Sequence, residues 1–218
     1  MEFKKETYSS QVYTYLTELI RRGELLPGEP VKEAVIADKL DISRAPIREA
    51  LQDMLHQGLL TSEPQKGKFV HVLTKKEIID SYALAGMLEG MGVSESLAAW
   101  SAKDMDELRS IIADMRQQAR TVSDLTDLMH FDDVFHNALL QHCDNSKLVS
   151  MARMSCVTIS KILMYREWLQ SYSPEIFAER HASIAEAMYT MKPEKVLEVL
   201  QGHYRELGER MAERCDNV

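Results

Sequence analysis

The order of apolar and polar positions in the first forty residues predicts two helices joined by a turn. Apolar residues recur at three- and four-residue spacing over residues 7–22, and Gly23 ends the pattern where a C-cap glycine is expected. The residues of that stripe are Val12, Leu16, Leu19 and Ile20. A turn rich in proline and glycine follows, and a second short helix is predicted over residues 32–40 with Val35, Ile36 and Leu40 directed inward.

A third helix is predicted from the sequence S-R-A-P-I-R-E-A-L at residues 43–51, although it contains a proline. If Ser43 is the N-cap, Pro46 lies in the first turn, where a missing N–H removes no hydrogen bond of the helix. The Ser43 hydroxyl is then expected to accept a hydrogen bond from the N–H of Ala45. The proline is therefore compatible with a helix that begins at Arg44.

A β-hairpin is expected after this helix. Two short strands are predicted over residues 59–63 and 68–73, around a turn that contains Gly67. Three helices followed by a hairpin are typical of a winged helix-turn-helix. The sequence thus predicts a first domain over residues 1–73.

From residue 74 onward the pattern changes to one helix after another. Thr74 and Glu77 have the spacing of a capping box, and Pro174 and Pro193 each stand in the first turn of an amphipathic run. Six helices are predicted, over residues 75–100, 103–119, 122–142, 145–171, 174–191 and 193–214. Because the connections are short, an antiparallel bundle is expected over residues 74–218, and the fold class is mainly α.

Composition agrees with a folded globular protein and adds a charge asymmetry. Hydrophobic residues make up 45% of the 218 and charged residues 28%. Residues 1–73 contain 10 basic and 11 acidic residues, so most of the net charge of −8 belongs to the second part. No apolar run of about 18 residues and no secretory signal is visible, so a cytoplasmic protein is expected. Five methionines are expected to fill the core rather than to form a binding surface: Met87, Met91, Met151, Met154 and Met164.

Two arginines on the third helix are candidates for binding nucleic acid. Arg44 and Arg48 are four residues apart and therefore share a face, where like charges weaken an isolated helix. Binding of an external anion such as DNA would account for the two like charges, because an arginine in the major groove can contact both phosphates and guanine. Lys66 and Lys68, on either side of Gly67, would meet neighbouring phosphates. The alternative interpretation is an ordinary solvated charged face.

Four residues of the second part are candidates for binding a metal ion. Asp132 and His136 are four residues apart on one helix face, and His181 and His203 each lie on an apolar stripe of a later helix. One carboxylate and three imidazoles form a donor set for zinc, with nickel, manganese or iron as alternatives. Each histidine taken alone is more often a satisfied core residue. The nearest competing ligands, His130 and Asp133, lie on other faces of their helix.

The first domain resembles the winged helix of GntR-family transcription regulators. The resemblance covers residues 10–73 and rests on G-E-L-L-P-G-E-P-V-K-E, I-A-D-K-L-D-I-S-R-A-P-I-R-E-A-L and G-K-F-V. It implies an operator-binding homodimer, most often a repressor. The residues that it implies in DNA contact are Ser43, Arg44, Ala45, Pro46, Arg48, Lys66 and Gly67, to which the position beside Gly67 adds Lys68.

The second domain is similar to the all-helical FCD effector domain of the FadR-type branch of these regulators. Metal-binding members use D-x-x-x-H and two later histidines, which correspond here to Asp132, His136, His181 and His203. The family also often has an arginine that binds an effector carboxylate, within Y-x-x-R-x-x-x-E. This chain has Y-A-L-A-G-M-L-E, with Ala85 in that place, so contact with an organic acid would fall to Arg153, Arg166 or the metal.

Three hypotheses for function follow from these features. The first is a regulator whose affinity for an operator changes when a small molecule binds at the metal. The second is a metal-dependent hydrolase, because an ion with open positions can activate water, although no nucleophile motif or phosphate loop accompanies the ligands. The third is a regulator in which the ion only stabilises the bundle.

Overall fold

The protein divides into two compact units in a computed structural model, which describes residues 7–215 except for the side chain of Ser160. The first unit contains the described residues up to Leu73 together with Val157–Arg166, and the second contains Thr74–Cys156 and the described residues from Glu167 onward. The expected division placed residues 157–166 in the second domain. The structure differs there because Leu163 is buried in the apolar core of the first unit, with Ile162 packed against that core.

The first unit has the predicted order of three helices and a hairpin. Its elements are α1 (Tyr8–Arg22), α2 (Glu33–Leu40), α3 (Arg44–His56), β1 (Leu60–Glu63) and β2 (Gly67–Val70). Thr7 caps α1 by accepting a hydrogen bond from the N–H of Ser10, and Gly23 ends the helix at a φ of 69°, which glycine adopts without strain. The strands are antiparallel, with Leu60 opposite Val70. Apolar side chains from all five elements form one core.

Two details of the predicted first domain are wrong: the capping hydrogen bond of Ser43 and the inward direction of Val35. Ser43 is the N-cap of α3, as expected, but its side chain makes no capping hydrogen bond. Pro46 is the third residue of that helix, where it removes no hydrogen bond within the helix. Val35 was expected to point inward, yet its side chain is 59% exposed and Ile36 alone is buried on that short helix.

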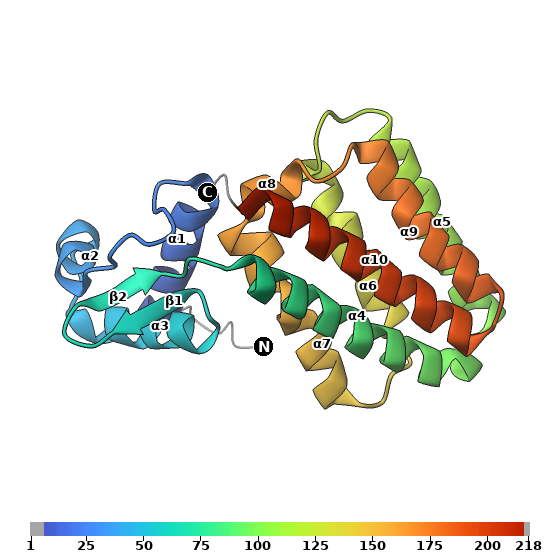
Figure 1. Cartoon of the computed structure of the whole chain (residues 1–218), viewed down its shortest axis with the longest axis horizontal. Helices are drawn as coiled ribbons and strands as arrows, with labels where there is room; N and C mark the ends of the chain where they lie inside the picture. The colour runs from blue at the N-terminus through green and yellow to red at the C-terminus, as the bar shows by residue number, and fades with distance from the viewer. Residues whose placement is uncertain (1–6, 216–218) are drawn as a thin grey trace, which may run out of the picture. The chain divides into compact units, whose positions relative to one another are not determined.

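The second unit is a helical bundle, as predicted. Its helices are α4 (Lys75–Ser96), α5 (Ala102–Ala119), α6 (Met129–Leu139), α7 (Ser146–Thr158), α8 (Tyr165–Leu169, of which Tyr165 and Arg166 count with the first unit), α9 (Pro174–Tyr189) and α10 (Pro193–Arg214). The capping box of Thr74 and Glu77 starts α4, and prolines start α9 and α10. Helices α4 and α10 lie side by side along most of their lengths (Figure 1).

Two predicted helices are shorter or interrupted. The helix expected over residues 122–142 begins only at Met129, after a 3-10 turn at Thr126–Leu128. Asp124 accepts a hydrogen bond from the N–H of Thr126, which stabilises that turn instead of a longer helix. The helix expected over 145–171 passes into a π turn at Ile159–Leu163 and stops at Met164, whose φ of −121° and ψ of 36° are not helical.

The methionines do not occupy the core as predicted. Met164 is buried, but four of the five singled out are about half exposed: Met87 (55%), Met91 (49%), Met151 (56%) and Met154 (61%). Two lie on α4 and two on α7. Despite this exposed apolar surface, none of the helices within residues 7–215 is both long and apolar enough to cross a membrane.

Glycines allow the close approach of α4 to α10. A Cβ atom added at Gly208 would lie 2.7 Å from Cβ of Tyr82, and one added at Gly86 would lie 2.9 Å from Cβ of Tyr204. Both distances are shorter than non-bonded carbon atoms tolerate. The two helices can therefore pack at this separation only because neither residue has a side chain. Gly202, also on α10, has no atom within 4 Å of such a Cβ.

We expect Gly208→Ala to destabilise the second unit by about 1–3 kcal/mol, because the added methyl group overpacks the contact with Tyr82. Gly202→Ala is the matched control on the same helix. It should stabilise the unit by about 0.5–1 kcal/mol, because alanine favours the helix and meets no neighbour. Urea unfolding followed by circular dichroism measures both changes. Equal effects of the two substitutions would contradict the close packing.

Candidate functional site

The first turn of α3 is open to solvent. Ser43, Arg44, Ala45 and Arg48 are exposed, and Pro46 is half-buried. The opposite face of the same helix is fully buried through Ile47, Ala50, Leu51 and Met54. The apolar face thus fixes the helix in its unit and leaves the two guanidinium groups outside, as the sequence predicted.

Glu33, which the sequence analysis did not identify, connects the candidate residues of the helix and the wing. Its Oε2 accepts hydrogen bonds from Nε and Nη2 of Arg48 at 3.3 and 3.2 Å, and its Oε1 accepts from Nζ of Lys68 at 3.2 Å. Hydrogen bonding from Arg48, and then from Lys68, lowers the pKa of Glu33. No local sequence pattern indicates this contact, because the partners are 15 and 35 residues away.

The tip of the wing is also accessible. Gly67 has a φ of 109°, a conformation that favours glycine, and no atom lies within 4 Å of a Cβ added there. Lys66 is largely exposed and pairs with Glu63 at 2.8 Å. The open backbone at Gly67 and the ammonium group beside it could approach a phosphate closely.

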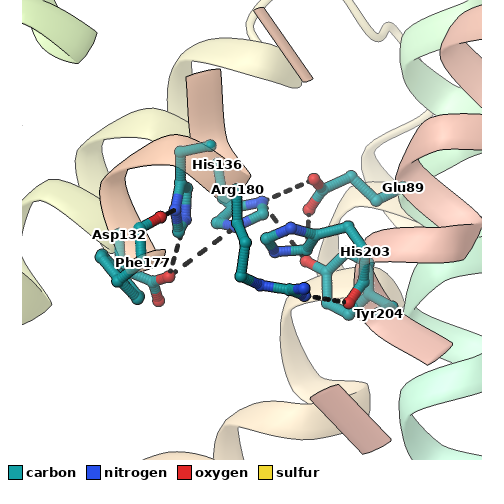
Figure 2. A network of polar contacts seen from close by, with 8 residues as sticks. Glu89, Asp132, His136, Phe177, Arg180, His203 and Tyr204 are labelled. Carbon is teal, nitrogen blue, oxygen red and sulfur yellow. Dashed lines mark hydrogen bonds and ion pairs between the residues drawn. The ribbon is translucent and has the colours of Figure 1, made fainter. Parts of the chain in front are cut away.

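The four candidate metal ligands of the second unit lie together. His136 comes from α6, His181 from α9 and His203 from α10, and one ligand atom of each lies within 4.8 Å of the others. Asp132, one turn before His136, places Oδ1 3.2 Å from Nε2 of His181 and 3.8 Å from Nε2 of His136. The predicted competitor His130 is exposed on the same helix. Figure 2 shows Asp132 and His136 of α6 and His203 of α10 pointing toward one another.

Both ring nitrogens of His181 face an oxygen acceptor, so a neutral ring can donate to only one of the two. Nδ1 of His181 is 2.8 Å from the carbonyl oxygen of Phe177, and a proton on Nδ1 satisfies this contact. Burial lowers the pKa of His181, so the ring is neutral and Nε2 carries a lone pair. That lone pair faces the carboxylate of Asp132. Two acceptors at 3.2 Å repel each other unless a cation lies between or beside them.

His136 and His203 complete the donor set. Nδ1 of His136 is 2.6 Å from Oε1 of Glu89, so this nitrogen donates a hydrogen bond to the carboxylate. The lone pair of Nε2 can then ligate a metal ion. The ring of His203 lies 5.1 Å from that of His181 and 5.6 Å from that of His136, measured between ring centroids. Burial lowers the pKa of His203 well below its usual value, which keeps the ring neutral and able to ligate.

Glu89 and Tyr204 support the ligands from α4 and α10. Glu89 is 3% exposed, and its second oxygen accepts a hydrogen bond of 2.8 Å from the Tyr204 hydroxyl. Burial, followed by the negative charge of Glu89, raises the pKa of Tyr204 well above its usual value, so the hydroxyl stays protonated and donates. The sequence contains a signal for Glu89, because Glu89 is the final residue of the Y-A-L-A-G-M-L-E segment.

The arginine beside the histidines is Arg180, which the sequence analysis did not select. A cavity of about 200 Å³ is lined by Arg180, Ser183, Val199, His203 and Glu206. Arg180 forms an ion pair with Glu206 and donates a 2.7 Å hydrogen bond to the carbonyl oxygen of His203. The two predicted effector-binding arginines are elsewhere: Arg153 is exposed on α7, and Arg166 belongs to the first unit, against Gly23.

Comparisons with known proteins assign both units. The family described as "Bacterial regulatory proteins, gntR family" matches residues 8–70, and the FCD domain matches residues 80–206. The chain is 26% identical over 187 residues to "Nta operon transcriptional regulator" of Aminobacter aminovorans, covering 84% of this chain and 86% of that one. It is 27% identical over 200 residues to "Probable D-xylose utilization operon transcriptional repressor" of Paenarthrobacter nicotinovorans, covering 91% and 86%.

The solved structures agree at the level of the fold. A crystal structure titled as a putative GntR transcriptional regulator from Rhodococcus sp. RHA1 superposes with a TM-score of 0.67 at 21% identity. The match covers 94% of this chain and 97% of that one. The two chains therefore share the same order of a winged module and a helical bundle.

We expect Tyr204→Phe to destabilise the second unit by about 1.5–3 kcal/mol. The substitution keeps the ring but removes a hydrogen bond to a buried carboxylate, and such bonds are stronger than neutral ones. Chemical unfolding of metal-free protein measures the change. A stability equal to that of the wild type would mean that Glu89 does not depend on the hydroxyl.

Proposed function

The chain belongs to the GntR family of bacterial regulatory proteins and carries an FCD domain, and from this premise we propose a metal-dependent response to a small metabolite. As a member of this family it is a DNA-binding transcriptional regulator and not an enzyme, which removes the hydrolase alternative. We propose a homodimeric repressor in the cytoplasm. In this proposal a metabolite bound at the metal of the second unit changes the affinity of the first unit for its operator.

The observation that carries the metal proposal is the approach of Asp132 to His181. Nε2 of His181 lies 3.2 Å from Oδ1 of Asp132, and with the proton of the neutral ring on Nδ1 its lone pair faces that oxygen; Nε2 of His136 lies 3.8 Å from the same oxygen. An enclosed group of acceptors is unfavourable without a cation. A donor set of three imidazoles and one carboxylate favours zinc, with nickel, manganese or iron as alternatives.

A metal held by four protein ligands can still accept a ligand, which supports a sensory role. When bound, the ion would supply a Lewis-acidic site for a donor atom of the metabolite. The cavity of about 200 Å³ beside His203 provides room for a small molecule. We propose that an organic acid enters it and that Arg180 meets its carboxylate, in the role first assigned to Arg153 or Arg166.

For operator binding we propose the exposed first turn of α3 and the tip of the wing. Arg44 and Arg48 would contact base edges and phosphates, while Ser43, Ala45 and Pro46 allow the backbone to approach. Lys66, Gly67 and Lys68 would follow the adjacent phosphates. A dimer would place two such modules on half-sites one helical turn apart, about 34–36 Å.

We expect His181→Ala and His203→Ala to lower the metal content of purified protein to a small fraction of the wild-type value, with the affinity for zinc reduced by at least about 100-fold. Each substitution removes one neutral imidazole from the donor set. His130→Ala is the matched control, because His130 is exposed on the same helix as His136, and it should retain full metal content. Elemental analysis measures all three, and equal metal content would contradict the assignment.

A cobalt-substituted protein separates a sensory metal from a structural one. Cobalt(II) has visible absorption bands that change when a coordination position gains a ligand. Added citrate or acetate should shift these bands in the wild type, and the shift should need higher concentrations in Arg180→Ala. Unchanged bands, together with a second unit that melts after chelation, would indicate an ion that only stabilises the bundle.

We expect Arg48→Ala to weaken operator binding by about 1–3 kcal/mol and to relax base choice at one position, because a specific arginine contact is lost. Arg22→Ala is the control, since Arg22 is equally exposed in the same unit and also pairs with a glutamate. Fluorescence anisotropy with operator DNA at fixed salt measures both variants. Equal affinities would argue against α3 as the recognition helix.

A further inference from the structure

A cavity of about 170 Å³ lies in the first unit, between α1, α2 and the turn that joins them. Its walls are mainly apolar and include Leu16 of α1, Val31 of the turn and Ile36 of α2, which also belong to the core of the unit. Val35, which is exposed although the sequence predicted it to point inward, lines the same cavity. An exposed valine in such a hollow offers an apolar contact to a small ligand.

Tyr15 and Lys39 add polar groups to the cavity. The hydroxyl oxygen of Tyr15 is buried and has no partner at hydrogen-bonding distance within residues 7–215. Nζ of Lys39 lies 5.6 Å from the centroid of the Tyr15 ring, and interaction with the hydroxyl raises the pKa of Lys39. A buried hydroxyl normally has a hydrogen-bond partner. A ligand that accepts from this hydroxyl and from the neighbouring ammonium group is an anion.

The charges around the cavity also favour an anion. Lys32 and Lys39, near the two ends of α2, both line it and are exposed. Among the described residues, the side chains lining the cavity include these two lysines and no carboxylate. Glu24 also acts on Lys39, but it is the smallest of the causes that shift the pKa of that group. The cavity is therefore locally positive, although the whole chain carries a net charge of −8.

We propose that this cavity binds an aromatic monocarboxylate, a ligand with the size and charge of benzoate. An apolar cavity of about 150 Å³ accommodates one benzene ring, so a volume of about 170 Å³ suits a ring of this size. The ring lies against the apolar walls, and the carboxylate accepts hydrogen bonds from the Tyr15 hydroxyl and from Lys39. The site belongs to the first unit, whereas the candidate metal ligands belong to the second.

Helix α2 is the element on which an occupied cavity acts. Ile36 is the only buried residue of this eight-residue helix, so few apolar contacts hold it in place. The same helix carries Glu33, whose carboxylate pairs with Arg48 and Lys68. A ring packed against Val35 and Ile36 adds contacts on the cavity side and stabilises α2 against local opening. The ligand thereby restrains Arg48, and only this effect on operator binding, not the site itself, rests on the proposed function.

Fluorine NMR of the full chain with 4-fluorobenzoate tests the site. The ligand signal should broaden when protein is added, with a dissociation constant on the order of 1 mM or tighter for a ligand of about ten heavy atoms. Val35→Trp fills the cavity and should weaken binding at least about 10-fold. Val72→Trp is the matched control, because Val72 is a second exposed valine of the same unit, and it should keep the wild-type affinity.

The charge requirement has its own variant and its own ligand. Lys39→Gln should weaken binding of 4-fluorobenzoate on the order of 10-fold, because a charge-assisted hydrogen bond is lost. Lys66→Gln is the control, since Lys66 is exposed on the wing of the same unit. 4-Fluorobenzyl alcohol has the same ring without the charge and should bind at least about 10-fold more weakly than the acid. Equal affinity for the alcohol and the acid would overturn the proposal.

His203→Ala distinguishes this cavity from the candidate metal centre, which is also proposed to take an organic acid. The variant should bind 4-fluorobenzoate like the wild type, because His203 belongs to the second unit. Binding that survives Val35→Trp but is lost in His203→Ala would place the ligand in the second unit and overturn the proposal. So would the absence of broadening at about ten times the expected dissociation constant.

Amide hydrogen exchange gives a second readout that requires no variant. With saturating 4-fluorobenzoate, peptides of α2 should exchange at least about threefold more slowly, while peptides of α5 should not change. Unchanged exchange of α2 with the ligand bound would overturn the proposed action on that helix. If Arg48→Ala binds the operator like the wild type while Val35→Trp loses the ligand, the recognition helix of the proposed function fails and the cavity site stands.

Discussion

The buried carboxylate of Glu89 is the contact on which the second unit depends. It receives hydrogen bonds from His136 of α6 and Tyr204 of α10, so a single side chain of α4 connects three helices (Figure 2). A carboxylate removed from water is tolerated only with such partners. The partners reach it because glycines let α4 and α10 approach closely, and Glu89 in turn directs the other nitrogen of His136 toward Asp132. Glu89 therefore both connects the packed helices and orients the candidate metal ligand His136.

Much of the fold and the ligand set could be predicted because local signals agree with the final structure. Gly23, Pro174 and Pro193 act at helix ends through their own backbone chemistry, and helical spacing alone brings Asp132 and His136 to one face. The π turn and the exposed methionines were missed, because periodicity shows which residues are apolar but not what covers them. Glu33 and Arg180 were missed because their partners are distant in sequence.

The ion pairs of Glu33 bear on how the winged module distinguishes DNA sequences. A carboxylate beside Arg48 and Lys68 holds both side chains in place but also reduces the positive charge of the surface. With a first domain of 10 basic and 11 acidic residues, attraction to the phosphate backbone is weak. With the base contacts proposed for Arg44 and Arg48, binding would depend on those contacts more than on bulk charge, which favours selectivity over general affinity.

The segment Val157–Arg166 limits how evolution can rearrange this chain. Leu163 fills part of the apolar core that Val12, Leu16 and Ile20 also form, although it is encoded more than eighty residues after the hairpin. A gene fusion that joined residues 1–73 to a different sensor would leave that core with a hole lined by apolar side chains. The winged module therefore cannot be exchanged freely between proteins. A new sensor domain could replace the present one only if it supplied an apolar side chain to fill the place of Leu163.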